Sequence, residues 1–470
     1  MSDKADKDLP RLAVITREKG ESRYYRDQYG DNILGITAPE SLEQLRELLK
    51  EAAKANFSLH VHGQNPAGNQ QYDNVVIVDL KNLNQVLEVN TRSAYALIEP
   101  GVTYKQLYEH LEKNKTGLWI DCDRNQLNTV SGSIANHEFG YTPYGDHMMM
   151  QCGMEVMLAN GELVRTTMGA LPGNNIWQLF KWGYGPWVDP IFTQSTLGII
   201  TKIGLWLMPA PPAYQPFMLS LRAKEDIAAA VEILRDLKIN VIVPNSVVIS
   251  NASLDALPYI KREDYSGPEG LNIDKIKSDM NLGEWNLYGA LYNTPDNVDL
   301  LWPMVSGALT SIEGASLFTN DNRLGEKVWT GREGLMCGKP LADFDNLEHW
   351  QGKFRCEIGL ACPPGGEDII QLNNIVAGVL EKYGFDDLSE CVAGWRSIVK
   401  RNYILFAEDN QPQAEQCVNE IIAKAGSRGY GLTHSRSNYP IFRFERTQDQ
   451  GMAVLNSGLK SALDPKHTLV

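Results

Sequence analysis

The sequence predicts a globular α+β protein with at least two domains. Its 470 residues are enough for two or three domains, which usually contain ~100–200 residues each. Hydrophobic residues make up 43% and charged residues 22% of the chain, a composition that can bury large cores. Apolar runs typical of strands alternate with helical patterns along the sequence, so both kinds of element are expected throughout.

The first part of the chain predicts alternating strands and helices. A helix is expected after a short strand at 33–37, because Ser41 and Gln44 fit a capping box in front of leucines at helical spacing. Residues 75–79 are almost all apolar, as in a buried strand. Further elements are expected as strands at 58–62 and 95–99 and as a helix at 104–114.

The second part predicts a separate α+β domain. A cluster of prolines at 209–212 ends the first domain, and a strand–helix–strand unit follows over 217–243, with 241–243 as its second strand. Later elements are expected as strands at 285–291 and 403–406 and as helices at 367–383, 413–425 and 451–463. We divide the chain into a leader segment (1–35), a first domain (36–212), a second domain (213–440) and a C-terminal return to the first domain (441–470).

Charge and motifs exclude several classes of function. The 44 Lys and Arg against 58 Asp and Glu leave a net charge of −14, which disfavours binding to a phosphate backbone. The N-terminus has no apolar core of a secretory signal, and the apolar stretch 198–208 is too short to span a membrane. No GxSxG, HExxH, Walker or GxGxxG motif occurs.

Individual polar residues point to no metal centre. The 7 cysteines are scattered without a CxxC pair, so free and mostly buried thiols are expected. His60 and His62 lack a third ligand and are interpreted as ordinary histidines. The carboxylate pairs are interpreted as solvated loop residues; they are Asp121 with Asp123 and Glu408 with Asp409.

A series of motifs carries the strongest signal. They lie at 141–147, 151–156, 158–161, 177–186, 192–199, 201–204 and 206–209 in the first domain, and at 242–249 and 285–292 in the second. In this order they resemble the flavoprotein subunits of the p-cresol methylhydroxylase (4-cresol dehydrogenase) type, in the vanillyl-alcohol oxidase family. The resemblance extends over roughly residues 35–465.

The resemblance implies a two-subdomain FAD-binding fold of the PCMH/VAO type, with an α+β cap domain over the isoalloxazine ring. Residues 36–212 would be the FAD-binding-type domain and 213–440 the cap. It also implies oxidation of 4-alkylphenols: hydride leaves the benzylic carbon for the flavin, and water adds to the quinone methide. Electrons would then pass to a c-type cytochrome subunit that carries haem c.

The cofactor segments depart from the family pattern. In the pyrophosphate loop G-R-N-x-G-Y-G, Gln64 replaces the arginine, Pro66 has no N–H, and Gly68 replaces a tyrosine that holds the phenolate. Glu138 places a carboxylate where the family has a glycine. If FAD binds, the resemblance assigns it to Gly63, Asn65, Gly68, Gly132, Ser133, Gly140, Tyr141, Gly198 and Ile199.

The catalytic positions of the cap are also replaced. Thr433 and His434 correspond to the Tyr-Arg pair that clamps the phenolate. Val399 and Tyr403 correspond to the family's His and Asp near the reacting carbon, and Glu390 is a retained glutamate. The chain ends before the family's A-P-G-R strand. No catalytic residue and no metal ligand is therefore assigned.

Together these changes favour a catalytically silent subunit without FAD. Glu348 stands at the position of the flavin-linking tyrosine, so no covalent flavin is expected. The partners would be an intact flavin-containing paralogue and a c-type cytochrome, in the periplasm by family resemblance. The alternative is an active dehydrogenase with non-covalent FAD that passes electrons to a cytochrome, and a cytoplasmic location is the alternative to the periplasm.

Overall fold

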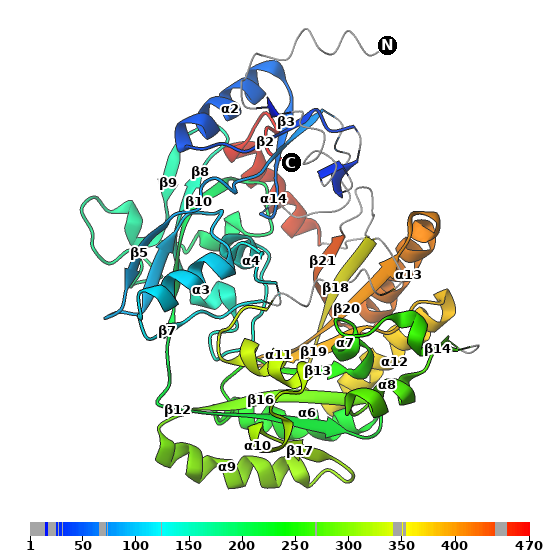
Figure 1. Ribbon diagram of the computed structural model, residues 1–470. Helices are drawn as coiled ribbons and strands as arrows, with labels where there is room; N and C mark the ends of the chain where they lie inside the picture. Colours follow the sequence, from blue (N-terminus) through cyan, green and yellow to red (C-terminus); the bar gives the residue numbers. More distant parts are fainter. Residues whose placement is uncertain are drawn as a thin grey trace.

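The computed structural model describes residues 15–16, 25–26, 28–30, 32–64, 72, 74–123, 125–267, 270–341, 350, 354–437 and 449–470. A first domain of two subdomains stands above a second domain built on one large sheet (Figure 1). The predicted α+β class is confirmed. Within these ranges, no helix has both the length and the apolar character needed to cross a membrane.

The first subdomain is a small sheet backed by one helix. Helix α2 (Leu42–Ala55) begins at Ser41, whose side chain accepts the amide proton of Gln44, and ends at Asn56 in the left-handed region, with φ 58°. This cap satisfies an N–H that would otherwise lack a partner. The strands, in spatial order, are β1 (Ile15–Thr16), β2 (Gly35–Thr37), β4 (Val75–Val78) and β3 (Ser58–Val61), the last three parallel.

The second subdomain is an antiparallel sheet whose central strands are buried along their length. In spatial order its strands are β5 (Val86–Asn90), β6 (Tyr95–Ile98), β10 (Ile199–Trp206), β8 (Gln151–Met157) and β9 (Leu163–Arg165). Its helices are α3 (Tyr104–Lys113), α4 (Val130–Ala135) and α5 (His147–Met150). A ribbon of β7 (Leu118–Trp119) and β11 (Met208–Pro209) leads towards the second domain.

The second domain is an eight-stranded antiparallel sheet. Its strands, in spatial order, are β17 (Ser316–Phe318), β12 (Ala213–Leu221), β16 (Trp285–Asn293), β13 (Val247–Asn251), β19 (Ser389–Ala393), β20 (Ile398–Phe406), β18 (Phe354–Cys362) and β21 (Gly431–Ser437). The other pieces are a small hairpin of β14 (Ser266–Gly267) and β15 (Gly270–Leu271), and helix α10 (Asn320–Arg323).

Helices cover both faces of this sheet. One face packs against α6 (Asp226–Ile239), α9 (Pro295–Thr310), α12 (Gly366–Tyr383) and α13 (Gln411–Gly426). The opposite face packs against α7 (Ala252–Ala256), α8 (Ile273–Met280) and α11 (Lys327–Met336). The core on that face continues into the first domain, so one apolar cluster spans both domains.

One predicted strand is wrong. Val241 has φ 57°, and the amides of Val241 and Ile242 donate back to the carbonyls of Lys238 and Leu237 at the end of α6. The N–H groups that could pair with a neighbouring strand are therefore already hydrogen-bonded to the end of α6. β-branched residues favoured a strand there, but the sheet resumes only at Val247.

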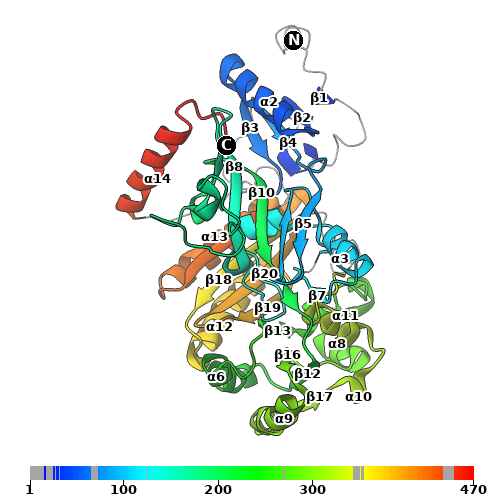
Figure 2. The same ribbon diagram turned by 90° about the vertical axis from the view of Figure 1, so that its left-hand side faces the viewer.

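The C-terminal residues return to the first domain. Helix α14 (Gln450–Leu463) is largely exposed and contacts that domain near its C-terminal end, where the Lys460 ammonium donates to the Thr196 carbonyl at 2.9 Å. The chain end lies beside β3 (Figure 2). Leu469 pairs with Leu59, and the Val470 carbonyl is 3.0 Å from Nδ1 of His60. The seven cysteines are all buried and free, as expected. The described residues contain no cluster of three or more His, Cys, Asp or Glu able to hold a metal ion.

Candidate cofactor groove and cap site

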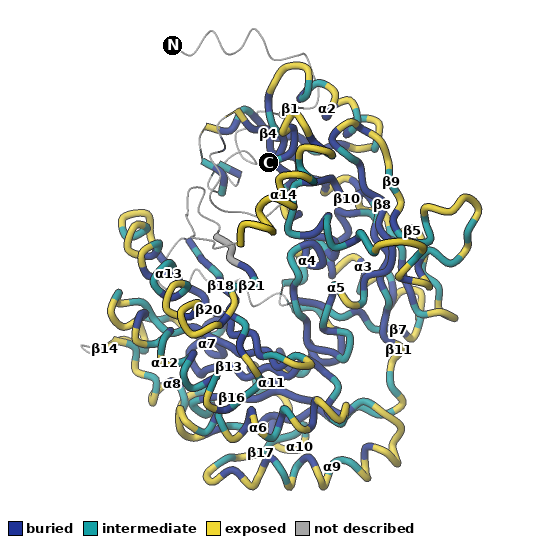
Figure 3. The backbone as a smooth tube through the Cα atoms, turned by 180° about the vertical axis from the view of Figure 1, so that it is seen from behind, coloured by how far each residue is buried: buried dark blue, intermediate teal, exposed yellow. Residues whose placement is uncertain are grey.

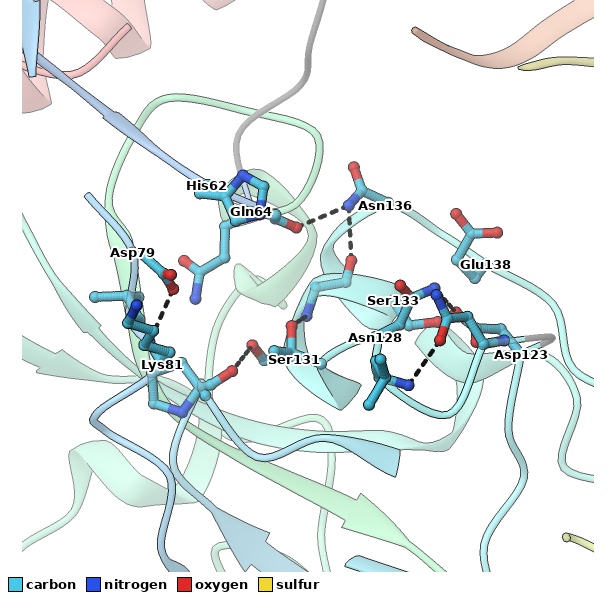
Figure 4. A pocket seen from close by; sticks show the side chains of 18 residues that line it. His62, Gln64, Asp79, Lys81, Asp123, Asn128, Ser131, Ser133, Asn136 and Glu138 are labelled. Carbon is cyan, nitrogen blue, oxygen red and sulfur yellow. Dashed lines mark hydrogen bonds between the residues drawn. The ribbon is translucent and has the colours of Figure 1, made fainter. Parts of the chain in front are cut away.

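A cavity of about 420 Å³ opens where strands β3, β4 and β6 end. It is lined by residues 62–64 after β3, 79–81 after β4, 100–101 after β6, and by α4 with the loop that precedes it (Figure 4). This volume lies within the range of small-molecule sites, roughly 300–1,000 Å³. The arrangement brings three strand ends and one helix to a single groove.

Glycines allow the walls of this groove to meet. A Cβ atom on Gly101 would lie 2.4 Å from the Leu80 carbonyl oxygen, and one on Gly132 would lie 2.8 Å from the Gly63 carbonyl oxygen. Both contacts involve backbone atoms, which cannot move aside like a flexible side chain. The loops after β3, β4 and β6 therefore hold their spacing through backbone contacts.

Gln64 is a structural residue of the groove wall. Its side-chain amide donates to the Ile200 carbonyl and accepts from the Ile200 N–H, both at 3.0 Å, and the residue is buried. The side chain thereby ties the loop after β3 to strand β10. Gln64 is thus held by the backbone of strand β10.

Carboxylates dominate the charge of the described groove lining. Asp79, Asp123 and Glu138 line it, and Lys81 is the one lysine or arginine among the described lining residues. Burial lowers the pKa of His62, although Asp79 acts in the opposite direction, so this imidazole adds no positive charge near neutral pH. The described lining of the groove is therefore net acidic.

The described part of this lining does not fit the diphosphate of FAD. A diphosphate is doubly charged and is usually held by cations and free backbone N–H groups. Asp123 accepts from the Asn125 amide and from Asn128, while Glu138 is 7% exposed at the groove wall. The described part of the groove is suited to hydroxyl groups, such as those of a ribose or ribityl chain.

Only some of the residues expected to bind the cofactor line the described groove. Gly63, Gly132 and Ser133 line the groove. The other described members lie elsewhere: Gly140 packs on Asp121, Gly198 packs on Val156, and Tyr141 and Ile199 are buried. Asn65, Gly68 and Glu348 lie outside the described residues, as do Pro66 and the rest of the loop up to residue 71.

A buried hydrogen-bonded cluster beside the groove was missed at the sequence level. His147 donates from Nε2 to Asp121 (2.6 Å), and its Nδ1 lies 2.9 Å from the Ser133 hydroxyl and 3.2 Å from the Tyr104 hydroxyl. Asp121 also accepts from the Tyr141 amide at 3.1 Å. This cluster joins helices α3 and α4 to the first residue of α5.

The interpretation of Asp121 and Asp123 as solvated carboxylates is wrong. The side chain of Asp121 is 4% exposed and Asp123 is also buried, because each organises a loop by accepting backbone N–H groups. Glu408 and Asp409 are exposed, as expected. A carboxylate that bonds loop amides leaves no spacing pattern in a sequence, since its partners can come from any loop.

In the second domain, Glu390 lies between two arginines. Its carboxylate oxygens are 3.5 Å from Arg332 Nη1 and 3.4 Å from Arg401 Nη1. Arg332 also donates to Asp255 at 2.7 Å. All four residues are buried, so the two carboxylates and two guanidinium groups neutralise one another inside the protein.

A second pair lies in the same sheet. His434 Nε2 is 3.2 Å from Glu357 Oε1, and the Tyr403 hydroxyl donates to that oxygen at 3.5 Å. Burial by itself raises the pKa of Glu357, but the hydrogen bond and charge of His434 outweigh it and hold this pKa below its usual range. Thr433 bonds the other ring nitrogen at 3.0 Å, and Val399 is a buried apolar residue.

Arg332, Arg401, Asp255 and Glu357 are site residues that sequence reasoning missed. The usable signal was charge inside apolar strand patterns: Glu357 lies in FRCEIGLAC and Arg401 in IVKRNYILF. Charged residues are almost never fully buried without partners, so such positions predict an internal ion pair. The identity of the partners could not be read from the sequence.

Comparisons with known proteins agree with this architecture. The family model described as an FAD binding domain matches residues 33–167. The 4-cresol dehydrogenase (hydroxylating) flavoprotein subunit of Pseudomonas putida is 33% identical, over 84% of this chain and 77% of that relative. The chain belongs to this flavoprotein family.

Solved structures of the family superpose on nearly the whole chain. A crystal structure of p-cresol methylhydroxylase with substrate bound matches with a TM-score of 0.90 and 29% identity, covering 99% of this chain and 94% of that one. The 4-ethylphenol oxidase from Gulosibacter chungangensis matches at 0.88 and 27% identity, covering 97% and 93%. The two subdomains are therefore an FAD-binding-type domain of this family, and the second domain is its cap.

Proposed function

We propose that this chain is a flavoprotein-type subunit of a methylhydroxylase-like complex that does not itself oxidise phenols. One observation carries the proposal: the polar groups at the cap positions are engaged with one another. Glu390 is held by Arg332 and Arg401, and His434 by Glu357. A substrate phenolate would have to displace these buried pairs.

The chemistry expected from the family depends on the groups that are replaced. Hydride loss from a benzylic carbon is driven by electrons of the phenolate oxygen, so that oxygen must be held by donors and a cation. Thr433 and His434 offer no arginine, and the His434 ring already contacts Glu357 and Thr433. Removing such a clamping group typically costs ~10²–10³-fold in rate.

The groove supports the second part of the proposal, that the chain carries no FAD. Asp79, Asp123 and Glu138 oppose a diphosphate, with Lys81 as the described cation. The complex would then depend on an intact flavin-containing paralogue for oxidation and on a small c-type cytochrome, with haem c, for electron removal. A periplasmic location follows if the chain is exported with such partners.

The test uses the purified full-length chain. We expect no flavin absorbance, no covalently bound flavin fluorescence after denaturation, and no turnover of 4-methylphenol with an artificial electron acceptor. The matched control is the Pseudomonas putida flavoprotein subunit assayed beside it. Flavin-dependent turnover comparable with the control would refute the proposal.

The size of the groove favours a second candidate, a chain that binds FAD without a covalent link. Titration of the purified chain with FAD, followed by flavin fluorescence, separates the two. Saturable binding that weakens in Gly132→Leu, which would fill the groove beside Gly63, would support this candidate. We expect no saturable binding in either protein.

A further inference from the structure

The backbone N–H groups around the groove already donate hydrogen bonds within the chain. In the loop after β4, the Lys81 amide donates to the Asp79 carboxylate at 2.9 Å. Where α4 begins, the amides of Gly132 and Ser133 donate to the hydroxyl and the carbonyl of Thr129, at 3.2 and 3.0 Å. Helix α4 is buried along its length (Figure 3). Because an N–H group donates one good hydrogen bond, these amides are not available to phosphate oxygens.

Acceptor oxygens, by contrast, remain at the described groove wall. The side-chain nitrogen of Asn136 donates to the carbonyls of Gly63 and Gly132, at 2.9 and 2.8 Å. The side-chain oxygen of Asn136 therefore turns away from both carbonyls, as Figure 4 shows. Glu138 adds a carboxylate to the same lining. Since an oxygen can accept two hydrogen bonds, this wall favours a ligand that donates hydrogen bonds, such as one with several hydroxyl groups.

Leu127 gives the groove an exposed apolar side chain. It is 66% exposed, and Pro100 lines the groove with it. The Leu127 amide donates to the side-chain oxygen of Asn125 at 2.7 Å, so the loop that carries the leucine is held by its own hydrogen bonds. Covering an exposed leucine removes apolar surface from water, which is favourable. A flat ring attached to the hydroxyl-bearing part of a ligand supplies that cover.

We propose that the groove binds a nucleoside-type ligand, which carries hydroxyl groups and a flat ring but no phosphate. The ribose hydroxyls donate to the oxygens of Asn136 and Glu138, and the ring covers Leu127. The carboxylates of Asp79, Asp123 and Glu138 in the lining disfavour a phosphate, because like charges at a contact weaken binding. This inference rests on the proposed absence of FAD, and it names the class of ligand that the groove takes instead.

The test compares adenosine, AMP and ADP, which share the ring and the ribose and differ only in phosphate. Isothermal titration calorimetry of the purified full-length chain measures the Kd of each. We expect saturable binding of adenosine and a Kd for ADP that is at least ~30-fold higher, because repulsion between like charges weakens binding. The ratio of these Kd values should fall when NaCl is raised from about 50 to about 500 mM, since salt screens the repulsion.

Two variants separate the effect of charge from that of the ring contact. Glu138→Gln keeps the shape of the side chain and removes its charge, so the ratio of the ADP Kd to the adenosine Kd should fall at least ~5-fold. Leu127→Ser removes an exposed side chain and should weaken adenosine and ADP binding by similar factors, because both ligands carry the ring. Glu408→Gln, on an exposed residue outside the described groove lining, is the matched control and should leave every Kd unchanged.

Three results would overturn the proposal: no saturable binding of adenosine, ADP that binds as tightly as adenosine, or a Glu138→Gln chain with an unchanged ratio of Kd values. Circular dichroism checks the folding of each variant, and the adenosine–ADP comparison with Leu127→Ser remains decisive if Glu138→Gln misfolds. FAD is titrated in parallel. Tight binding of FAD contradicts both this inference and the proposed function, whereas a chain that binds none of these ligands contradicts this inference alone.

Discussion

Glu390 is a buried carboxylate that lies between two buried guanidinium groups. At 0% exposure it would be strongly disfavoured as a lone anion, yet Arg332 and Arg401 lie within 3.5 Å and 3.4 Å. Replacing one member of such a network lowers the free energy of unfolding by more than the intact network adds to it, because the remaining charges stay buried without a partner. Glu390 is therefore held as one member of an ion-pair network.

We predict that Glu390→Gln lowers the free energy of unfolding by about 3–5 kcal/mol, since two buried guanidinium groups lose a shared anion. Urea denaturation followed by tryptophan fluorescence measures this change. Glu408→Gln, on an exposed residue, is the matched control and should lie within about 0.5 kcal/mol of wild type. Equal stability of the two variants would mean that the network does not hold the cap.

At the same scale, the sequence identified Glu390, Thr433 and His434 as positions of interest, but not their partners. Arg332 lies in α11 and Glu357 in β18, far along the chain from the residues they contact. No spacing rule connects such residues, because their proximity results from the order of strands in the sheet. These positions could be named from the sequence, whereas the bonds they form could not.

At the scale of elements, the C-terminal residues are held by one aspartate. Asp464 is 1% exposed, and it accepts the backbone N–H groups of Thr468 and Leu469, both at 2.9 Å, and the Lys460 ammonium at 2.7 Å. These bonds place Leu469 beside Leu59 in β3. The last turn of the chain thus closes the edge of the first sheet.

We predict that Asp464→Asn lowers the free energy of unfolding by about 1.5–3 kcal/mol at pH 7, because hydrogen bonds to a charged group are lost. Burial raises the pKa of Asp464, but Lys460 and the two amides lower it by more, so it lies below the usual value. A carboxyl with a lowered pKa stabilises the fold above its unfolded pKa, about 3.9, and loses this effect as pH falls through the folded value.

The difference between wild type and Asp464→Asn should therefore shrink below about pH 4. Denaturation at pH 7 and pH 3.5 checks this, with hydrogen exchange at Leu59 as a local readout. Asp409→Asn is the control, because Asp409 is an exposed residue. A difference that is the same at both pH values would contradict the assigned role.

At the scale of the whole molecule, the two domains share a core and a set of polar contacts. Asn245 is 0% exposed; its side chain donates to the Tyr141 carbonyl at 3.1 Å and accepts from the Ala290 amide at 3.2 Å. Arg401 reaches the Phe139 carbonyl at 3.3 Å. These hydrogen bonds join the FAD-binding-type domain directly to the cap sheet.

We predict that Asn245→Ala lowers stability by about 2–4 kcal/mol, because two buried backbone groups lose their partner. It should also separate the unfolding of the two domains into two calorimetric transitions where the wild type shows one. Asn297→Ala, at an exposed position on α9, should leave a single transition unchanged. A single transition in Asn245→Ala would show that the shared apolar core alone couples the domains.

The sequence by itself determined the local elements. Ser41 and Gln44 predicted the start of α2, and the apolar run at 75–78 predicted β4, because caps and hydrophobic periodicity act between near neighbours. The tertiary structure alone decided that 241–243 turns, that Gln64 bonds Ile200, and that Lys181 is buried beneath exposed aromatic rings. Each of these features depends on which residues from distant parts of the chain lie beside it. Tertiary packing brings those residues together, and sequence spacing does not reveal it.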